Sequence, residues 1–212
     1  EIINRNLPIW MTYEPGSTFK IITLSAALEE KTINLFEDTF HDSGAIEVDG
    51  AVIHCWKHGG HGTQKMIEVV ENSCNPGFVK IGQTLGTDKL MSYINNYGFG
   101  SKTGVDLNGE SSGILFKPEN MGPVELATTS FGQGISVTPL QQIRAVSAAI
   151  NGGKLLTPHI VGSFKESETG SIIKKVEPNV EKQVISEETS KLVRHALESV
   201  VANGSGRNAY IE

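Results

Sequence analysis

Two short segments of the chain carry side chains suited to acyl transfer. In EPGSTFK, Ser17 precedes Lys20 by three residues, and in NSCNPGFV, Ser73 is followed by Asn75. Residues i and i+3 of a helix share one face, so the Lys20 amine can reach the Ser17 hydroxyl. A serine hydroxyl becomes a good nucleophile when a base takes its proton, and lysine can be that base where burial or a nearby cation lowers its pKa. The pair therefore suggests covalent catalysis through a serine ester.

Each segment also has a plainer explanation. Serine often caps a helix next to an unrelated surface lysine, and Ser and Asn are favoured in turns that link helices. The two patterns gain weight in combination, because S-x-x-K followed by S-x-N makes two of the three parts of a known serine active-site set, whose third part is K-T-G. The order of the two patterns in this chain is the order of that set.

Four segments together resemble the transpeptidase domain of class B penicillin-binding proteins: EPGSTFK, NSCNPGFV, NYGFGSKTGVDLNGE at 96–110 and ATTSFGQGISVTPLQ at 127–141. CWKHGGHG adds a similarity to the sporulation-type enzymes of spore-forming Gram-positive bacteria. The resemblance implies an α+β fold of the β-lactamase/transpeptidase type. It also implies a peptidoglycan D,D-transpeptidase that acts on D-Ala-D-Ala stem peptides, is acylated by β-lactams and takes part in cell wall or spore cortex synthesis.

The resemblance further assigns roles to four residues. Ser17 would be the acyl-forming nucleophile, Lys20 its general base, Ser73 the proton relay to the leaving group, and Asn75 the amide that binds the substrate backbone and orients Lys20. It implies a location on the extracytoplasmic face of the bacterial cell membrane, an anchoring N-terminal helix outside this chain, and a glycosyltransferase of the cell-wall machinery as partner.

Two other functions use the same nucleophile. A serine β-lactamase needs a further group to activate the water that removes the acyl chain, and Glu110 and Glu125 are the carboxylates considered for that role. A β-lactam sensor module would be acylated and signal without turnover. The lifetime of the penicilloyl adduct separates the hydrolase from the transpeptidase.

A K-T-G tripeptide does occur, at Lys102-Thr103-Gly104, but it lies in a glycine-rich loop well before the last predicted helix. In the family the catalytic K-T-G follows that helix on an edge strand, so we interpret residues 102–104 as loop structure and expect the catalytic motif shortly after Glu212. Residues 1–212 would then be a partial transpeptidase domain. We expect this chain alone to be catalytically impaired, because the third motif supplies a cation near Lys20 and an oxyanion donor.

A second group of residues has the composition of a metal site. Cys55, His58 and His61 follow the pattern C-x2-H-x2-H, and Cys74 lies between Ser73 and Asn75 in the sequence. Two thiolates and two imidazoles make a tetrahedral zinc set with no open position, which predicts a structural role, with His54 as a possible substitute ligand. The alternatives are a Cys55–Cys74 disulfide, or free thiols beside solvated histidines.

Composition and periodicity complete the prediction. The formal net charge of −6 and the absence of a lysine- or arginine-rich run give no support to nucleic-acid binding. The 212 residues suffice for one sizeable core. Period and capping residues predict helices at 17–28, 63–72, 76–86, 87–97, 138–153 and 186–204, with Thr63, Thr138 and Ser186 as caps. TPHIVGSFKES and SIIKKVEP should form a hairpin, residues 38–62 an irregular or weakly stranded loop region, and residues 100–125 a loop. Such a mixture favours helices packed on an antiparallel sheet that is incomplete within this chain.

Overall fold

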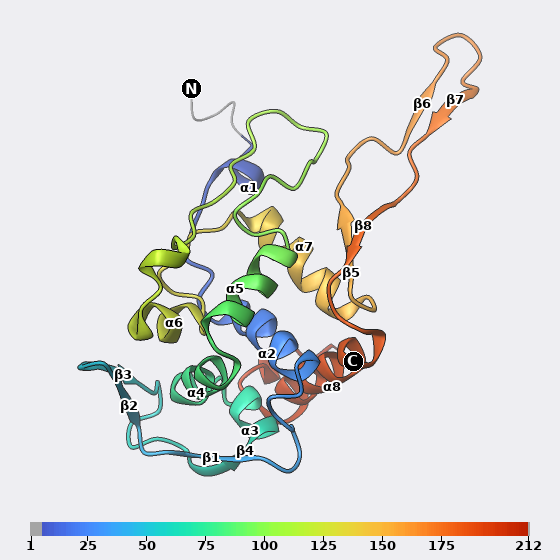
Figure 1. The fold of residues 1–212 in the computed structure, drawn as a ribbon. Helices are drawn as coiled ribbons and strands as arrows, with labels where there is room; N and C mark the ends of the chain where they lie inside the picture. Colours follow the sequence, from blue (N-terminus) through green and yellow to red (C-terminus); the bar gives the residue numbers. More distant parts are fainter. Residues whose placement is uncertain (1–5, 212) are drawn as a thin grey trace.

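The structure, a computed structural model, describes residues 6–211 (Figure 1). The helices are α1 (Leu7–Trp10), α2 (Lys20–Glu29), α3 (Met66–Glu71), α4 (Asn75–Leu85), α5 (Thr87–Asn96), α6 (Pro123–Thr129), α7 (Pro139–Ile150) and α8 (Glu187–Asn203). The strands are β1 (Thr39–Asp42), β2 (Ala45–Val48), β3 (Ala51–His54), β4 (Gly62–Lys65), β5 (Lys154–Thr157), β6 (Ser163–Lys165), β7 (Ile172–Lys175) and β8 (Asn179–Gln183). Short 3₁₀ turns are η2 (Gly16–Phe19), η3 (Pro118–Asn120) and η4 (Arg207–Ala209).

Helix α2 is the centre of the core. It lies among α4, α5, α7 and α8 (Figure 1), and its residues from Ile22 to Leu28 are all buried. A helix that is apolar nearly all round can be stable only when other helices cover every face. Its two buried hydroxyls are paired: Thr23 donates to the Ser130 carbonyl at 2.9 Å, and Ser25 bonds the Tyr97 hydroxyl at 2.7 Å. The start of α2, which carries the S-x-x-K segment, is therefore held by a rigid interior.

The segment before α2 is fixed from behind by residues 132–137. Tyr13 pairs with Val137 in an antiparallel bridge, and the Gly16 N–H donates to the Gly132 carbonyl at 2.9 Å. Gly132 has φ of +83°, and a Cβ there would lie 2.1 Å from the Gly16 carbonyl oxygen. Only glycine allows the two backbones to approach this closely. The FGQG segment thus supports the turn that carries Ser17.

Two small antiparallel pairs lie beside α3 and α4. Strand β1 pairs with β4, with Asp42 opposite Gly62, and β2 pairs with β3, with Ala45 opposite His54. The Cys55 N–H donates to the Gly44 carbonyl at 2.9 Å and so extends the second pair by one residue. The two pairs meet at residues 42–44, so the segments around residue 55 and residue 62 both lie beside this turn.

A long ribbon made of β5–β8 and β6–β7 projects from the body at the end of α7 (Figure 1). The Asp106 carboxylate, from the 96–110 segment, accepts the N–H groups of Ile160 and Val161 at 2.7 and 2.9 Å. This contact ties the ribbon to the glycine-rich loop near its base.

The α+β prediction is confirmed, and the helices at 76–86, 87–97, 138–153 and 186–204 occur within a few residues of the expected bounds. As predicted, Thr138 caps α7: its hydroxyl accepts the Gln141 N–H at 3.1 Å. Two local predictions were wrong. Residues 63–65 belong to strand β4 rather than to a helix capped by Thr63, and residues 123–125, expected to be loop-like, begin helix α6. The weak strands expected within 38–62 are present as β1, β2 and β3. Within residues 6–211 the strands form four two-stranded pairs rather than one sheet.

Candidate active site

Ser17 lies in the 3₁₀ turn η2, at the point where the chain enters α2. The Lys20 N–H bonds to the Ser17 carbonyl in this turn. In a 3₁₀ turn the side chains at i and i+3 are almost eclipsed, so Ser17 and Lys20 lie on one face. Ser17 is exposed whereas Lys20 is only 4% exposed. The pair thus places a hydroxyl in reach of ligands and an amine behind it.

Ser73 owes its position to the way α3 ends. Its φ is +49°, the left-handed conformation that is uncommon for residues other than glycine. The Ser73 N–H donates to the Val70 carbonyl and the Cys74 N–H to the Val69 carbonyl, both at 3.0 Å, which is the hydrogen-bond pattern of a Schellman helix end. The abrupt change of direction sends the Ser73 side chain towards Lys20 and buries Cys74 completely.

Lys20 joins the two motifs. Its Nζ donates to the Ser73 carbonyl at 2.8 Å, to Ser73 Oγ at 3.0 Å and to Asn75 Oδ1 at 2.7 Å. An ammonium group has three hydrogens, and these three acceptors match them one for one. The amine also lies 5.2 Å from the centre of the Phe78 ring. The structure therefore confirms that Ser73 and Asn75, which follow Lys20 by 53 and 55 positions in the sequence, both bond to its amine.

The surroundings of Lys20 favour its neutral form, which is the form that can act as a base. Burial lowers the pKa of Lys20 from 10.5 to about 8, while the neighbouring Cys74 and Cys55 act in the opposite sense. Removal of water from around an ammonium disfavours its charged form, which is why burial has this direction. A substantial fraction of Lys20 is then neutral at mildly alkaline pH and can accept a proton.

Ser17, Lys20 and Ser73 line a common pocket of about 260 Å³. Its other walls come from α2, α3, α4, the C-terminal half of α8 and the turn that follows α8, through Ile21, Leu24, Val70, Phe78, Leu197, Val200 and Ser205. Most of this wall is apolar, and its polar side chains are those of Ser17, Thr18, Lys20, Ser73 and Ser205. A pocket of this kind can hold an acyl group against the Ser17 hydroxyl with Lys20 next to it.

The predicted metal group is only partly as expected. Cys55, His61 and Cys74 do come together, but the fourth member is Asp42, and the ligand atoms of these four residues lie within 4.8 Å of one another. His58 is exposed and is not part of the group, so its assignment needs correction.

The hydrogen bonds of this group centre on one carboxylate oxygen. Asp42 Oδ2 lies 2.9 Å from His61 Nδ1 and 3.3 Å from Cys74 Sγ, and Cys55 Sγ lies 3.3 Å from His61 Nδ1. Burial opposes the ionisation of Asp42, but the bonds from Cys55, His61, Gly44 and Cys74 outweigh it and hold the pKa of the carboxyl well below its usual range. Burial raises the pKa of Cys74 to about 12, and that of Cys55 is raised for the same principal reason. Both thiols are therefore protonated at neutral pH unless a cation is bound.

The glycines of GGHG explain how His61 reaches Asp42. Gly60 has φ of +77°, and a Cβ there would lie 2.3 Å from the Asp42 carbonyl oxygen. The loop can cross the 42–44 turn only because residue 60 has no side chain. The next residue then lies directly over the carboxylate, and its backbone N–H also donates to Asp42 Oδ2 at 3.0 Å.

Asp42 was missed because its sequence neighbours give no signal. It stands in a HDSG segment thirteen residues before Cys55, outside the C-x2-H-x2-H pattern. A search for every Asp near the CWKHGGHG segment would have found it only as one of several acidic residues. Its role depends on the pairing of β1 with β4, which places residue 42 opposite residue 62.

The K-T-G tripeptide is engaged within its own loop. The Glu110 carboxylate accepts the Thr103 N–H at 2.7 Å, the Gly104 N–H at 3.2 Å and the Thr103 hydroxyl. Thr103 is 2% exposed. These contacts agree with the interpretation of residues 102–104 as loop structure. They also occupy both oxygens of Glu110, one of the carboxylates considered for water activation.

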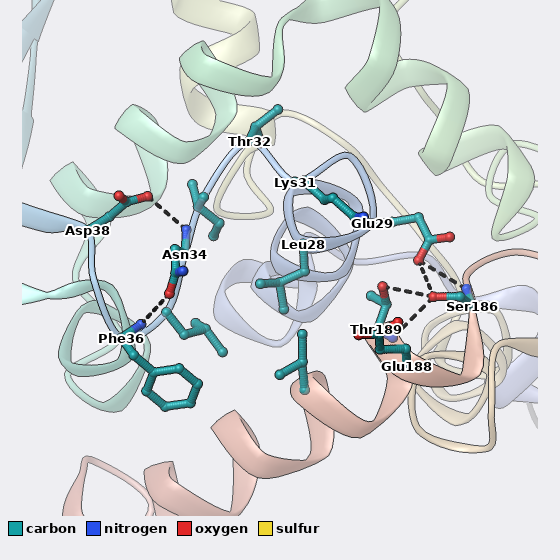
Figure 2. A pocket seen from close by; sticks show the side chains of 13 residues that line it. Leu28, Glu29, Lys31, Thr32, Asn34, Phe36, Asp38, Ser186, Glu188 and Thr189 are labelled. Carbon is teal, nitrogen blue, oxygen red and sulfur yellow. Dashed lines mark hydrogen bonds between the residues drawn. The ribbon is translucent and has the colours of Figure 1, made fainter.

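A larger pocket of about 730 Å³ lies elsewhere, between the chain after α2 and the start of α8. Figure 2 shows that its polar groups are mostly bonded to one another. Glu29 Oε2 accepts the N–H and hydroxyl of Ser186, at 3.0 and 2.8 Å, and Asp38 Oδ2 accepts the Asn34 N–H at 2.7 Å. The Glu29–Ser186 bonds fasten the end of α2 to the beginning of α8, and the Asn34–Asp38 bond closes the loop after α2, so we interpret this pocket as a structural junction.

Comparison with known proteins agrees with the motifs. Residues 3–211 match the family of the penicillin binding protein transpeptidase domain. The chain is 63% identical to Stage V sporulation protein D of Bacillus subtilis over 211 residues, which is 100% of this chain and 33% of that protein. It is 30% identical to penicillin-binding protein PbpB of Mycobacterium tuberculosis over 190 residues, 89% of this chain and 27% of that protein.

Solved structures show the same fold. The D,D-transpeptidase domain of a peptidoglycan glycosyltransferase from Eggerthella lenta superposes with a TM-score of 0.91 at 27% identity, covering 98% of this chain and 53% of that one. The chain spans about a third of the length of the curated relatives given above. With Ser17, Lys20 and Ser73 in one pocket, Asn75 bonded to Lys20 and a family match over residues 3–211, the chain belongs to the penicillin-binding protein transpeptidase domain family.

Proposed function

We propose that the protein is a peptidoglycan D,D-transpeptidase that works through a serine acyl-enzyme and is acylated by β-lactams. The observation that carries the proposal is the contact of the buried Lys20 amine with Ser73 and Asn75, in the pocket that also contains Ser17. The names of relatives support it, since several are peptidoglycan D,D-transpeptidases or penicillin-binding proteins.

The proposed chemistry assigns one task to each of the four residues. Neutral Lys20 takes the proton of Ser17, and Ser17 Oγ attacks the carbonyl carbon of the penultimate D-Ala. The C–N bond then breaks, and Ser73 passes a proton to the departing D-Ala amine, so that the leaving group is neutral. Asn75 holds Lys20 through Oδ1 and would bind the substrate backbone. A second stem-peptide amine then attacks the ester and forms the crosslink. With a β-lactam the same attack opens the ring amide, and the ester remains.

A fixed donor near Ser17 would stabilise the oxyanion that forms during the attack. The Ser17 N–H lies at the start of the α2 segment, where the helix dipole favours negative charge.

The direct test is covalent labelling with a fluorescent penicillin, followed by mass spectrometry of the labelled peptide. We expect one penicilloyl adduct on Ser17 that forms slowly in this chain, is absent from Ser17→Ala and lasts for hours. An adduct on another residue, or its absence from the unchanged protein after long incubation, refutes the proposal. Turnover within seconds indicates the β-lactamase instead.

We also propose that Asp42, Cys55, His61 and Cys74 hold a structural Zn²⁺. Tetrahedral zinc with one oxygen, one nitrogen and two sulfur ligands sets ligand–ligand distances of about 3.3–3.8 Å. The three contacts within the group, from 2.9 to 3.3 Å, need only small adjustments to fit. The cation would fix the charge state of both thiols and so brace Cys74, which stands between Ser73 and Asn75.

The zinc proposal has a matched pair of variants. His61→Ala removes a ligand, whereas His58→Ala removes an exposed imidazole from the same loop. We expect about one zinc per chain in the purified protein and in His58→Ala, and a loss of most of it in His61→Ala. Equal zinc contents in the two variants contradict the ligand assignment. If the protein contains no zinc and both thiols can be titrated, the cysteines are free. If it contains no zinc and neither thiol can be titrated, they form a disulfide.

The proposal also covers the cellular location of the protein, its partner in the cell and its role in sporulation. Relatives named for peptidoglycan work support a role on the extracytoplasmic face of the membrane, beside a glycosyltransferase. Among residues 6–211, none of the helices combines the length and apolar character needed to cross a bilayer. A role in sporulation follows the 63% identity to a sporulation protein. Deletion of the gene with microscopy of spores and of dividing cells tests this role.

A further inference from the structure

Each residue of the segment 54–56 contacts, or lies close to, a residue of the segment 72–75. The Asn75 Nδ2 donates to the His54 carbonyl at 3.4 Å, Cys55 and Cys74 meet at Asp42, and the Trp56 Nε1 donates to the Asn72 carbonyl at 2.7 Å. Ser73 is left between these contacts with its hydroxyl on Lys20.

The Trp56 contact answers a specific need of the backbone. Asn72 is the C-cap residue of α3, and the next residue, Ser73, adopts the left-handed conformation. Carbonyls at a helix C-terminus lack an intrahelical partner and must find one elsewhere. The indole N–H supplies that partner directly, at a short distance, to the peptide unit that joins Asn72 to Ser73.

The exposure of Trp56 argues against a packing role. Its side chain is 63% exposed, so burial of apolar area does little to hold it in place. The ring makes a hydrogen bond to Asn72 and approaches His61 edge-on, with ring centres 5.3 Å apart. The hydrogen bond links the CWKHGGHG segment to the loop that carries Ser73, and the approach to His61 lies within the segment itself.

We infer that Trp56 is a positioning residue for Ser73: its indole N–H fixes the Asn72–Ser73 peptide and thereby the distance between Ser73 Oγ and Lys20 Nζ. This inference rests on the proposed function for its effect on catalysis, but not for its effect on the backbone. Trp56 does not need to touch the substrate. A shift of a relay group by a fraction of an ångström slows proton transfer, whereas substrate binding by the rest of the pocket is unchanged.

The test compares two variants that differ in place only. Trp56→Phe keeps an aromatic ring beside His61 and removes the N–H, and Trp10→Phe removes the chain's other indole from α1. For each variant, the first-order acylation rate at saturating fluorescent penicillin and the half-saturating concentration are measured. We expect Trp56→Phe to lower the saturating rate about tenfold with less than a twofold change in half-saturation, because geometry rather than binding is lost. Trp10→Phe should behave as the unchanged protein.

Replacement of Trp56 by its benzothiophene analogue sharpens the test, because sulfur replaces the N–H and the ring shape is kept. The analogue should be as slow as Trp56→Phe, and a rate equal to that of the unchanged protein overturns the inference. Zinc content and melting temperature are measured alongside. A rate loss that follows loss of zinc also overturns it, because Trp56 would then act through the metal group.

Amide hydrogen exchange separates this inference from the proposed function. In Trp56→Phe the Ser73 and Cys74 amides should exchange at least several-fold faster than in the unchanged protein, while amides in the middle of α2 should not change. Unchanged exchange rates at the Ser73 and Cys74 amides overturn the positioning role of Trp56. If the unchanged protein forms no Ser17 adduct, the proposed function fails, and the exchange data still decide the positioning role.

Discussion

The pH dependence of Ser17 acylation gives the sharpest test of Lys20 as the base. With a pKa of about 8, roughly one Lys20 in eleven is neutral at pH 7 and about ten in eleven at pH 9. If the neutral amine accepts the Ser17 proton, the acylation rate rises about tenfold over this range and then levels off. With the ordinary value of 10.5 the rise would be about a hundredfold, with no plateau by pH 9.

The assay measures fluorescent penicillin on the protein at short times, in a series of buffers from pH 6 to 10, at constant ionic strength. Because the bound label is counted, alkaline hydrolysis of free penicillin enters only as a correction to its concentration. Cys74, with a pKa of about 12, does not titrate in this range. A flat profile, or a rise that continues past pH 9.5, refutes the reasoning.

Lys20→Arg is the matched variant, because it keeps a cation beside Asn75 and removes the base. Arginine stays protonated throughout the range, so we expect a rate lower by about 10²–10⁴ and no inflection near pH 8. A variant that retains the inflection would show that another group titrates. Its melting temperature must be close to that of the unchanged protein for the comparison to hold.

The same pKa shift has a consequence for stability. The folded-state pKa of Lys20 lies below the unfolded value, so between pH 8 and 10.5 the unfolded chain binds more protons and stability rises with pH. The shift of 10.5 to about 8 corresponds to a cost of about 3 kcal/mol at pH 7, which disappears above pH 10.5. In urea unfolding, the free energy of the unchanged protein should therefore gain on that of Lys20→Met as pH rises from 8 to 10.5. A difference that is independent of pH contradicts this.

Three further outcomes are expected. Asn75→Ala removes a 2.7 Å contact of Lys20 and should lower the acylation rate about 10–100-fold at saturating penicillin, with melting temperature as the control. Lys102→Ala should acylate within about twofold of the unchanged protein, since this K-T-G is bonded within its own loop; a large loss would make Lys102 the missing cation. Gly132→Ala should cost about 3 kcal/mol or more in denaturant unfolding, against about 1 kcal/mol for Gly16→Ala, which meets nothing within 4 Å; equal costs would refute the close-approach argument.

The prediction from sequence succeeded where the determining contacts are local. S-x-x-K lies within one turn of chain, and the caps at Thr138 and Ser186 bond N–H groups three residues ahead. The order of the two catalytic patterns was also readable, because each pattern is complete within a few residues. Short-range sterics and hydrogen bonding suffice for such features.

The prediction failed where a residue's state depends on the pairing of distant segments. Residues 63–65 were predicted to begin a helix, but pairing with β1 makes them part of a strand. His58 fits the spacing of a metal ligand, and yet the crossing of Gly60 over Asp42 turned His61 inward and left His58 exposed. Spacing along the chain does not specify which side of a loop faces the interior.

The sequence by itself determined the family, the placing of Ser17 and Lys20 within one turn and the order of the motifs, because these depend on residue identity and on contacts within a turn. Only the tertiary structure decided that Ser73 adopts φ of +49°, that Asp42 completes the metal group and that Trp56 holds the Asn72 carbonyl. The lowered pKa of Lys20 belongs to the same class. For the metal group, the Trp56 contact and the Lys20 pKa, the physical reason is the packing of segments that are far apart in the chain. The φ of Ser73 instead follows from the hydrogen bonds that end α3.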